Sequence, residues 1–152
     1  MPQSLSAIYV HAIFHVKSTS VAIQECDADE LCSYIAGVLD KLDCKSVQIG
    51  CVRDHVHLLF RLSSTITLAD MIAKVKVASN HFLNAKGPAY SNGFAWQAGY
   101  AAFSVSYKQL AIAKAYVASQ KEHHKDKCFN EEYLKFLKGN HVDFNEEYIF
   151  RD

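Results

Sequence analysis

The sequence predicts an α+β protein: an antiparallel sheet with helices on one face, followed by a tyrosine-bearing helix near the C-terminus. Three observations lead to this class. Segments with strand-like and helix-like apolar spacing follow the order strand, helix, strand, strand, helix, strand. The 152 residues are 50% apolar and 21% charged, a composition that excludes disordered and fibrous chains. Only two prolines and six glycines interrupt them, so we expect one domain over residues 1–152.

A change in apolar spacing indicates the first strand and the first helix. Residues 7–16 are rich in β-branched and aromatic side chains, which favour extended structure. Over residues 29–42, leucine, isoleucine and valine recur every three or four positions, as on the buried side of a helix. Asp27 precedes Glu30 by three positions and resembles a capping box, so we expect a helix over residues 29–42.

Two short apolar runs and a second helical pattern follow. Residues 45–52 and 55–62 are separated by only two residues, which predicts an antiparallel hairpin. A threonine three positions before an aspartate marks the start of a helix over 67–84. An aromatic-rich segment at 94–105, extended in part, completes the order of a ferredoxin-like or RRM-like sheet. The second face of this sheet would be free for a ligand or for further helices.

Two more helices are predicted towards the C-terminus. Ser106 and Gln109 have the spacing of a capping box in front of a helix over 107–125. Asn130 is a favourable N-cap for a short helix that ends at Gly139, a residue type common just after helices.

The segment DHVHLLF, residues 54–60, is the most distinctive local pattern. Side chains two positions apart on a strand point to the same face, so His55 and His57 present two imidazoles side by side while Val56 faces a core. A divalent metal would satisfy both rings, because neutral imidazole is a common ligand. The alternative is a pair of histidines held by ordinary hydrogen bonds, and this spacing alone favours that alternative.

A polar stripe on the predicted helix over 107–125 is the second pattern. Tyr116, Gln120, His123 and His124 are spaced by three or four positions and therefore share one face. A helical tyrosine often packs its ring into a core. That alternative does not explain why polar residues continue the stripe.

Together these motifs resemble the insertion-sequence-200/605-type transposases, single-tyrosine members of the HUH endonuclease superfamily. The resemblance runs nearly end to end, through YVHAIFHVK, IGCVRDHVHLLFRL, TLADMIAKVK, FAWQAGYAAFSVS and YVASQKEHH. It implies that His55 and His57 bind a divalent metal, Mg²⁺ or Mn²⁺, with Gln120 as a third ligand. It implies that Tyr116 is the nucleophile, and that the protein cuts and rejoins single-stranded DNA through a covalent 5′-phosphotyrosine.

The resemblance also implies the partners. The substrate would be single-stranded DNA with hairpins at the element ends. The protein would be a homodimer in which each tyrosine helix can pack against the partner's histidines, and the short connector at 104–106 could allow that exchange.

The distribution of charge agrees with a DNA partner. The formal net charge is zero, but residues 44–121 hold nine basic and only two acidic residues, as a phosphate backbone would require. From this stretch we assign four DNA-binding residues: Arg53, Lys74, Lys76 and Lys108. The aromatic residues Phe94, Trp96, Tyr100 and Phe103 could stack on bases or belong to the core.

Other features exclude some protein classes and leave alternatives open. No apolar run is long enough for a membrane helix, and there is no secretory signal pattern. Five scattered cysteines suggest reduced thiols in a cytoplasmic protein. Three alternatives remain: a domesticated relative that cuts chromosomal palindromic repeats, a non-catalytic nucleic-acid-binding module, and a zinc hydrolase that uses His55, His57 and a cysteine such as Cys51.

Overall fold

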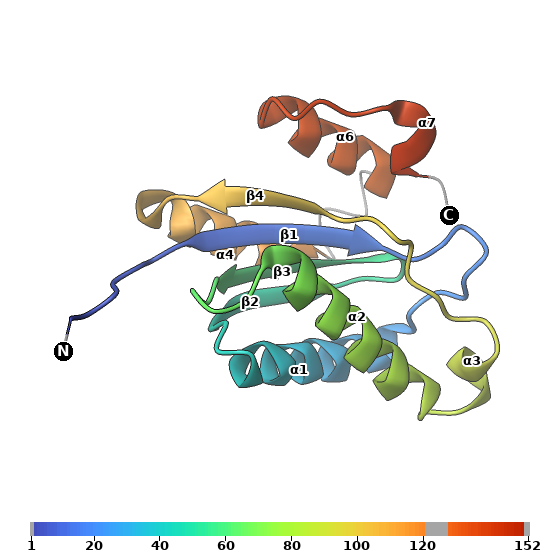
Figure 1. Cartoon of the computed structure of the whole chain (residues 1–152). Helices are drawn as coiled ribbons and strands as arrows, with labels where there is room; N and C mark the ends of the chain where they lie inside the picture. Colours follow the sequence, from blue (N-terminus) through green and yellow to red (C-terminus); the bar gives the residue numbers. More distant parts are fainter. Residues whose placement is uncertain (1, 121–127, 151–152) are drawn as a thin grey trace.

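The computed structural model describes residues 2–120 and 128–150 (Figure 1). Its elements, in chain order, are β1 (Tyr9–His15), α1 (Glu25–Lys41), β2 (Ser46–Cys51), β3 (His55–Arg61), α2 (Leu68–Asn84), α3 (Pro88–Ser91), β4 (Ala101–Val105), the 3₁₀ turn η1 (Tyr107–Gln109), α4 (Leu110–Ala118), α6 (Phe129–Gly139) and α7 (Glu146–Ile149). None of the helices in these two ranges is long and apolar enough to cross a membrane.

The four strands form one antiparallel sheet in the order β2-β3-β1-β4. The central strands β1 and β3 pair along their whole length, with His15 opposite His55 and Ile13 opposite His57. Strand β2 joins β3 through the predicted hairpin, and β4 lies on the far side of β1. This arrangement confirms the predicted α+β, ferredoxin-like sheet.

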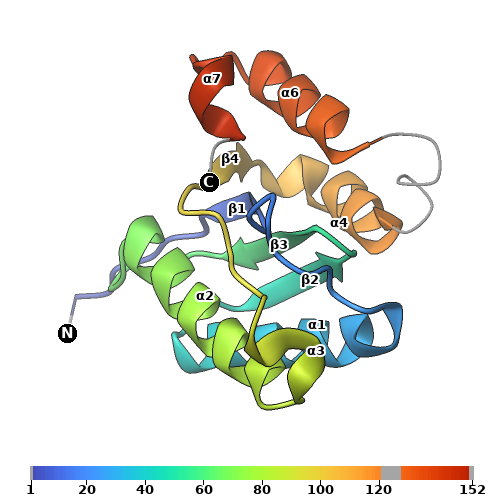
Figure 2. The same cartoon turned by 90° about the vertical axis from the view of Figure 1, so that its right-hand side faces the viewer.

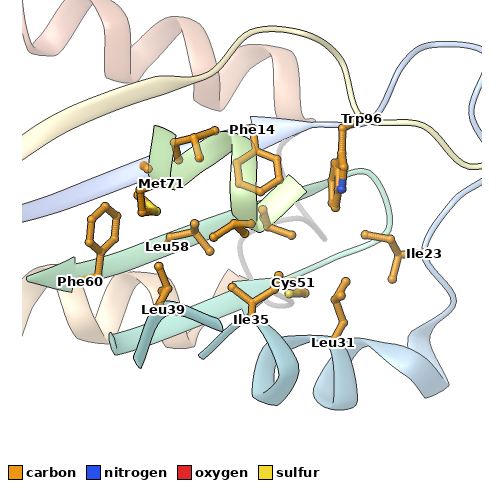
Figure 3. Packing of buried hydrophobic residues seen from close by; sticks show 14 of the residues in the cluster. Phe14, Ile23, Leu31, Ile35, Leu39, Cys51, Leu58, Phe60, Met71 and Trp96 are labelled. Carbon is orange, nitrogen blue, oxygen red and sulfur yellow. The ribbon is translucent and has the colours of Figure 1, made fainter. Parts of the chain in front are cut away.

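Helices α1 and α2 lie side by side on one face of the sheet and bury the main core (Figures 1 and 2). The core takes one side chain of every two from the central strands, as the pleat of a strand requires. Figure 3 shows its members, among them Phe14, Leu31, Ile35, Leu39, Leu58, Phe60 and Met71. The alternate residues of the same strands, including His55 and His57, therefore face the other way.

The opposite face of the sheet is covered by α4 and α6 (Figure 2). Phe129, Tyr133 and Leu137 recur every four residues along α6, and these side chains join Ile13 and Phe103 in a second buried cluster. The sequence left this face open to a ligand or to further helices, and in the structure further helices occupy it. The histidines therefore lie between the sheet and a helical layer.

The aromatic-rich segment is less extended than predicted. Only β4 is strand, and before it Trp96 makes an isolated bridge to Val16. Phe94 and Trp96 belong to the main core and Phe103 to the second cluster, whereas Tyr100 is exposed. The core interpretation therefore holds for three of these four residues.

The start of α2 matches the sequence pattern, but the start of α1 does not. Thr67 Oγ1 accepts a hydrogen bond of 3.1 Å from the backbone of Asp70, as predicted. Helix α1 begins at Glu25, four residues before the predicted start at residue 29, without a side-chain cap. The Asp27 carboxylate instead accepts a hydrogen bond from the Tyr90 hydroxyl, so a distant contact replaces the predicted local one.

The two C-terminal predictions are partly correct. The predicted helix over 107–125 begins as η1 and continues as α4, and residues 121–127 lie outside the described residues. Ser106 makes no side-chain cap bond, so the predicted capping box does not form. Helix α6 ends at Gly139 as predicted, but its N-cap is Cys128 rather than Asn130.

Gly50 on β2 allows α4 to approach the sheet, and we expect Gly50→Ala to destabilise the protein. An added Cβ would lie 2.6 Å from the Val117 carbonyl oxygen and 3.0 Å from Gln120 Cγ, so α4 would have to shift. The expected loss is about 1–3 kcal/mol in the free energy of unfolding, measured by urea denaturation. The control is Gly37→Ala within α1, where no atom lies within 4 Å of an added Cβ and alanine favours the helix. Equal loss in both variants would contradict this account.

Candidate active site

Four buried histidines lie on the face of the central strands that α4 and α6 cover: His11, His15, His55 and His57. They come from alternate positions of β1 and β3, and the antiparallel register places His15 opposite His55. The predicted pairing of His55 and His57 on one face is therefore present. The histidines of β1 were not predicted as site residues.

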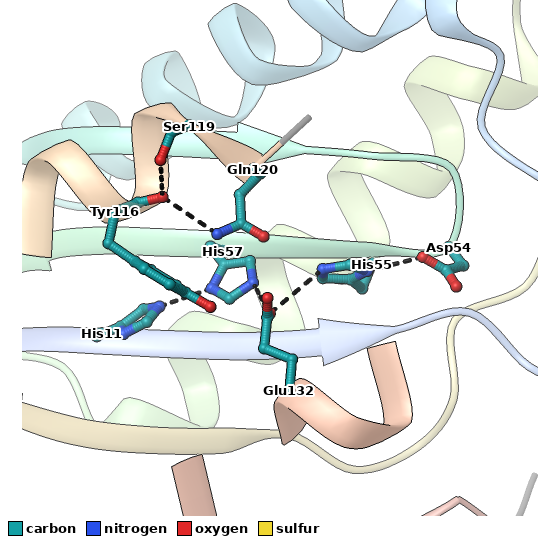
Figure 4. A network of polar contacts seen from close by, with 8 residues as sticks. All are labelled: His11, Asp54, His55, His57, Tyr116, Ser119, Gln120 and Glu132. Carbon is teal, nitrogen blue, oxygen red and sulfur yellow. Dashed lines mark hydrogen bonds and ion pairs between the residues drawn. The ribbon is translucent and has the colours of Figure 1, made fainter. Parts of the chain in front are cut away.

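In His55 and His57, one ring nitrogen, the inner one, faces Glu132, and the other, the outer one, faces a different partner (Figure 4). The two inner atoms, His55 Nε2 and His57 Nε2, lie 3.7 and 2.7 Å from the same carboxylate oxygen of Glu132. The outer atoms have other partners: His55 Nδ1 lies 2.7 Å from Asp54 Oδ1, and His57 Nδ1 lies 2.7 Å from His11 Nε2. Outer hydrogen bonds of this kind orient histidines that bind metals.

Glu132 is the member of the site that the sequence did not reveal. It lies on α6, one turn from the cluster residues Phe129 and Phe136, and their packing carries its carboxylate to the histidines. Burial alone would raise the pKa of Glu132, but the hydrogen bond and charge of His57 outweigh it and lower the pKa to about 2. The carboxylate is therefore ionised at neutral pH.

The nucleophile candidate Tyr116 reaches the same centre from α4. Its ring centroid lies 5.9 Å from that of His57, and its hydroxyl donates a hydrogen bond to Glu132. Burial is the main cause that raises the pKa of Tyr116, Glu132 adds to it, and a hydrogen bond from Gln120 opposes it. In this arrangement the phenol is protonated.

Gln120 follows Tyr116 by one helical turn and is almost fully buried. Its Nε2 donates a 3.2 Å hydrogen bond to the Tyr116 backbone carbonyl, and Figure 4 shows the amide above His57. The structure thus brings together the four residues predicted for the chemistry: Tyr116, Gln120, His55 and His57. The other two members of the predicted stripe, His123 and His124, lie outside the described residues.

The donors at this centre fit a divalent metal. Ligand atoms of His55, His57 and Glu132 all lie within 4.8 Å of one another, and all three residues are buried. Two imidazoles with a carboxylate and a nearby amide oxygen form the mixed nitrogen and oxygen set that Mn²⁺ accepts and Mg²⁺ tolerates. The ionised carboxylate would offset part of the ion's charge.

Comparison with known proteins identifies the family. The family model for IS200-like transposases matches residues 4–120. The chain belongs to this family. The matched range contains the histidine pair, Tyr116 and Gln120, whereas Glu132 lies beyond it. The family therefore agrees with the resemblance inferred from the motifs.

Two solved structures share the fold of this IS200-like family member. A candidate transposase from Deinococcus radiodurans R1 has a TM-score of 0.60 and 21% identity, over 79% of this chain and 95% of that one. A REP-associated tyrosine transposase bound to a REP hairpin has a TM-score of 0.59 and 12% identity, over 82% of this chain and 72% of that one. No curated protein matches the chain in sequence.

The predicted DNA-binding residues of this transposase-family protein do not share one surface. Arg53 lines a cavity of about 300 Å³ beside Asp54, next to the histidine pair. Lys108 lies on η1, ahead of the tyrosine helix. Lys74 and Lys76 lie on α2, which covers the opposite face of the sheet. The Lys76 ammonium donates hydrogen bonds of 2.7 Å to the carbonyls of Gln97 and Gly99, which is a structural role.

The cysteine predicted for a zinc site is not near the histidines. Cys51 is buried in the main core, on the face covered by α1 and α2, while His55 and His57 face α4 and α6. Burial raises the pKa of the Cys51 thiol well above its ordinary value, and contact with Cys32 adds to the effect. The proposed ligand set of His55, His57 and Cys51 is therefore wrong.

Proposed function

We propose that this protein is a DNA strand transferase that cuts and rejoins single-stranded DNA through a covalent bond to Tyr116. One observation carries the proposal: the Tyr116 hydroxyl meets the Glu132 carboxylate at the point where His55 and His57 converge. A nucleophile and a set of metal donors thus share one centre, in a member of a transposase family.

The metal would be Mg²⁺ or Mn²⁺, held by His55, His57 and Glu132 with Gln120 beside them. When bound, it would supply positive charge that polarises and orients the scissile phosphate. Asp54 and His11 hold the outer nitrogens of the histidine pair, which would leave the inner nitrogens to bind the ion. No cysteine is needed in this set.

The chain's own residues account for the bond changes. Tyr116 Oη forms a bond to phosphorus, the bond from phosphorus to the 3′ oxygen breaks, and that oxygen takes a proton as Tyr116 loses one. Glu132 orients the hydroxyl through its hydrogen bond before the attack. The product is a 5′-phosphotyrosine and a free 3′-hydroxyl. A second 3′-hydroxyl can reverse the step, which rejoins strands without ATP.

The DNA partner would be single-stranded and would carry a hairpin, since a structural neighbour is bound to a REP hairpin. Its backbone would contact Arg53, which lines the cavity beside Asp54, and Lys108, which lies on η1 just ahead of the tyrosine helix. The active site would be complete within one chain, because Tyr116 lies over its own histidines. A homodimer in the cytoplasm remains our prediction, and light scattering of the purified protein tests the dimer.

We expect Arg53→Ala to weaken binding of single-stranded DNA and Lys74→Ala, an exposed residue of α2, to leave it unchanged. Arg53 lies beside the site, whereas Lys74 lies on the opposite face. Fluorescence anisotropy over a salt series measures both. If Arg53 contacts one phosphate, its loss should lower the slope of log affinity against log salt by about 0.7. Equal effects of the two substitutions would contradict this placement of the strand.

A covalent-adduct assay tests the function. A hairpin-bearing single strand labelled at its 3′ end is incubated with the protein and Mn²⁺, then analysed on a denaturing gel. The proposal expects a labelled band at the mass of protein plus DNA, and none with EDTA. Binding without an adduct would instead indicate the non-catalytic module. If adducts form, imperfect palindromes just inside the gene's flanks would indicate a mobile element, and their absence a domesticated relative.

A further inference from the structure

A second cavity, of about 280 Å³, opens beside Tyr116. We propose that it binds one unpaired nucleobase of the substrate strand, next to the phosphodiester that Tyr116 attacks. The inference rests on the function proposed above and adds a base-reading site to it. The cavity is lined by His11, Phe103, Ser104, Val105, Gln109, Ile112, Ala113, Tyr116, Phe136 and Asn140.

The aromatic side chains in the lining of the cavity pack against one another. Phe103 and Phe136 stack with ring centroids 5.7 Å apart and an interplanar angle of 19°. Phe136 also meets Tyr116 edge to face at 5.4 Å and His11 at 5.1 Å. Flat aromatic surfaces that are fixed by one another suit stacking of a base, and proteins that hold single strands use them for that purpose.

The rim of the cavity offers polar groups but no charge. Gln109, Ser104 and Asn140 are exposed at its edge, and a 2.9 Å hydrogen bond from Asn140 Nδ2 to the Phe136 carbonyl fixes the Asn140 amide. Amide side chains can both donate to and accept from the edges of bases. The described lining includes no lysine, arginine or carboxylate, so the cavity suits a neutral ring better than a phosphate.

The other cavity near the site has the opposite character. Its lining includes Arg53 and Lys17, together with Asp54, whose carboxylate contacts His55. Helix α6 with its C-cap Asn140 reaches both cavities. Phe129 and Asn130 line the cavity with Arg53 and Lys17, the cationic cavity, and Phe136 and Asn140 line the cavity beside Tyr116, the aromatic cavity. A strand whose backbone lies on the cationic side and whose base enters the aromatic side would place a phosphate between them, at Glu132 and Tyr116.

The volume of the aromatic cavity and its position beside Tyr116 both suit a single base. Its volume of about 280 Å³ is close to the lower end of the range for small-molecule sites, about 300 Å³, so it has room for one flat ring system. Tyr116 forms part of its wall, so it is continuous with the active site. His11 lies in the same wall and bonds to His57, which connects the cavity to the metal donors.

Abasic scanning of the substrate tests the proposal. Single strands with one abasic site at each position around the cut are compared in single-turnover adduct formation. We expect a loss of at least about fivefold at one position beside the cut. Two variants alter the cavity: Phe136→Leu, and Gln109→Ala at an exposed residue. In both, the loss of adduct formation caused by the abasic site should shrink, or the base preference at that position should change. Lys138→Ala, on α6 outside the aromatic cavity, is the matched control and should retain the full penalty.

A binding measurement separates this inference from the proposed function. In Tyr116→Phe, which keeps the ring but cannot attack, 2-aminopurine at the same position should be quenched on binding, and Phe136→Leu should remove the quenching. Quenching without any wild-type adduct would overturn the function and keep the cavity. Adducts with neither quenching nor an abasic penalty would overturn the cavity. A disulfide-linked dimer of Ile112→Cys would assign the cavity to a second copy and also overturn it.

Discussion

Tyr116→Phe is expected to abolish the covalent adduct while the protein remains folded. The substitution removes the attacking oxygen and keeps the ring that packs against His57 and Phe136. Loss of a nucleophile lowers turnover by several orders of magnitude in well-studied hydrolases, so adduct formation should fall more than about 10³-fold. The measurement is the denaturing-gel assay with a 3′-labelled strand, together with circular dichroism to verify folding.

Tyr107→Phe is the matched control for this substitution. Tyr107 lies on η1, just before the helix that carries Tyr116, and it is 77% exposed. Its ring lies beside Tyr9 at the start of β1, whereas His55 and His57 pair with the other end of that strand. The adduct should therefore form at the wild-type rate. If Tyr116→Phe formed the adduct as well as wild type, another residue would be the nucleophile and the proposed mechanism would be wrong.

His57→Ala is expected to remove both Mn²⁺ binding and adduct formation. His57 Nε2 is the inner donor closest to Glu132, at 2.7 Å, and His57 also holds His11 through its other nitrogen. Disturbing the residues that orient a metal ligand costs about 10–100-fold in metal affinity, and loss of a ligand itself should cost at least as much. Electron paramagnetic resonance of free Mn²⁺ measures the affinity without any DNA.

Two further variants identify the metal donors. Glu132→Gln keeps the size of the side chain and removes its charge, so it should weaken Mn²⁺ binding if the carboxylate is a ligand. His81→Ala removes an exposed histidine of α2, on the far face of the sheet, and should leave the affinity unchanged. Mn²⁺ binding that survives His57→Ala would show that the ion, if needed, is held elsewhere.

Local patterns in the sequence were sufficient for the order of the sheet elements and for His55, His57, Tyr116 and Gln120, but not for Glu132. The alternation of DHVHLLF places His55 and His57 on one face, because successive side chains of a strand point to opposite faces. The four-residue spacing of Tyr116 and Gln120 places them one turn apart on a helix. Thr67 caps α2 because its partner is only three residues away. Each of these outcomes depends on neighbours in the chain.

Outcomes that depend on distant neighbours were missed. Asp27 does not cap α1, because the helix begins two residues earlier, at Glu25, and the Asp27 carboxylate accepts a hydrogen bond from the distant Tyr90 hydroxyl. The basic stretch from 44 to 121 does not form one surface, because α2 carries Lys76 to the face away from the histidines, where backbone carbonyls bind it. A count of charges along the chain cannot tell which side of a sheet each residue will occupy.

The sequence by itself therefore determined the order of the four strands and of the two helices α1 and α2 between them, the pairing of the two histidines and the turn that joins Tyr116 to Gln120. It did not predict the short helices α3 and α7. Only the tertiary structure decided that Glu132 completes the centre, 75 residues from His57 along the chain. The physical reason is that α6 reaches the site through the packing of Phe129, Tyr133 and Leu137 on the sheet. That packing depends on long-range apolar contacts, which no local pattern around a single glutamate reveals.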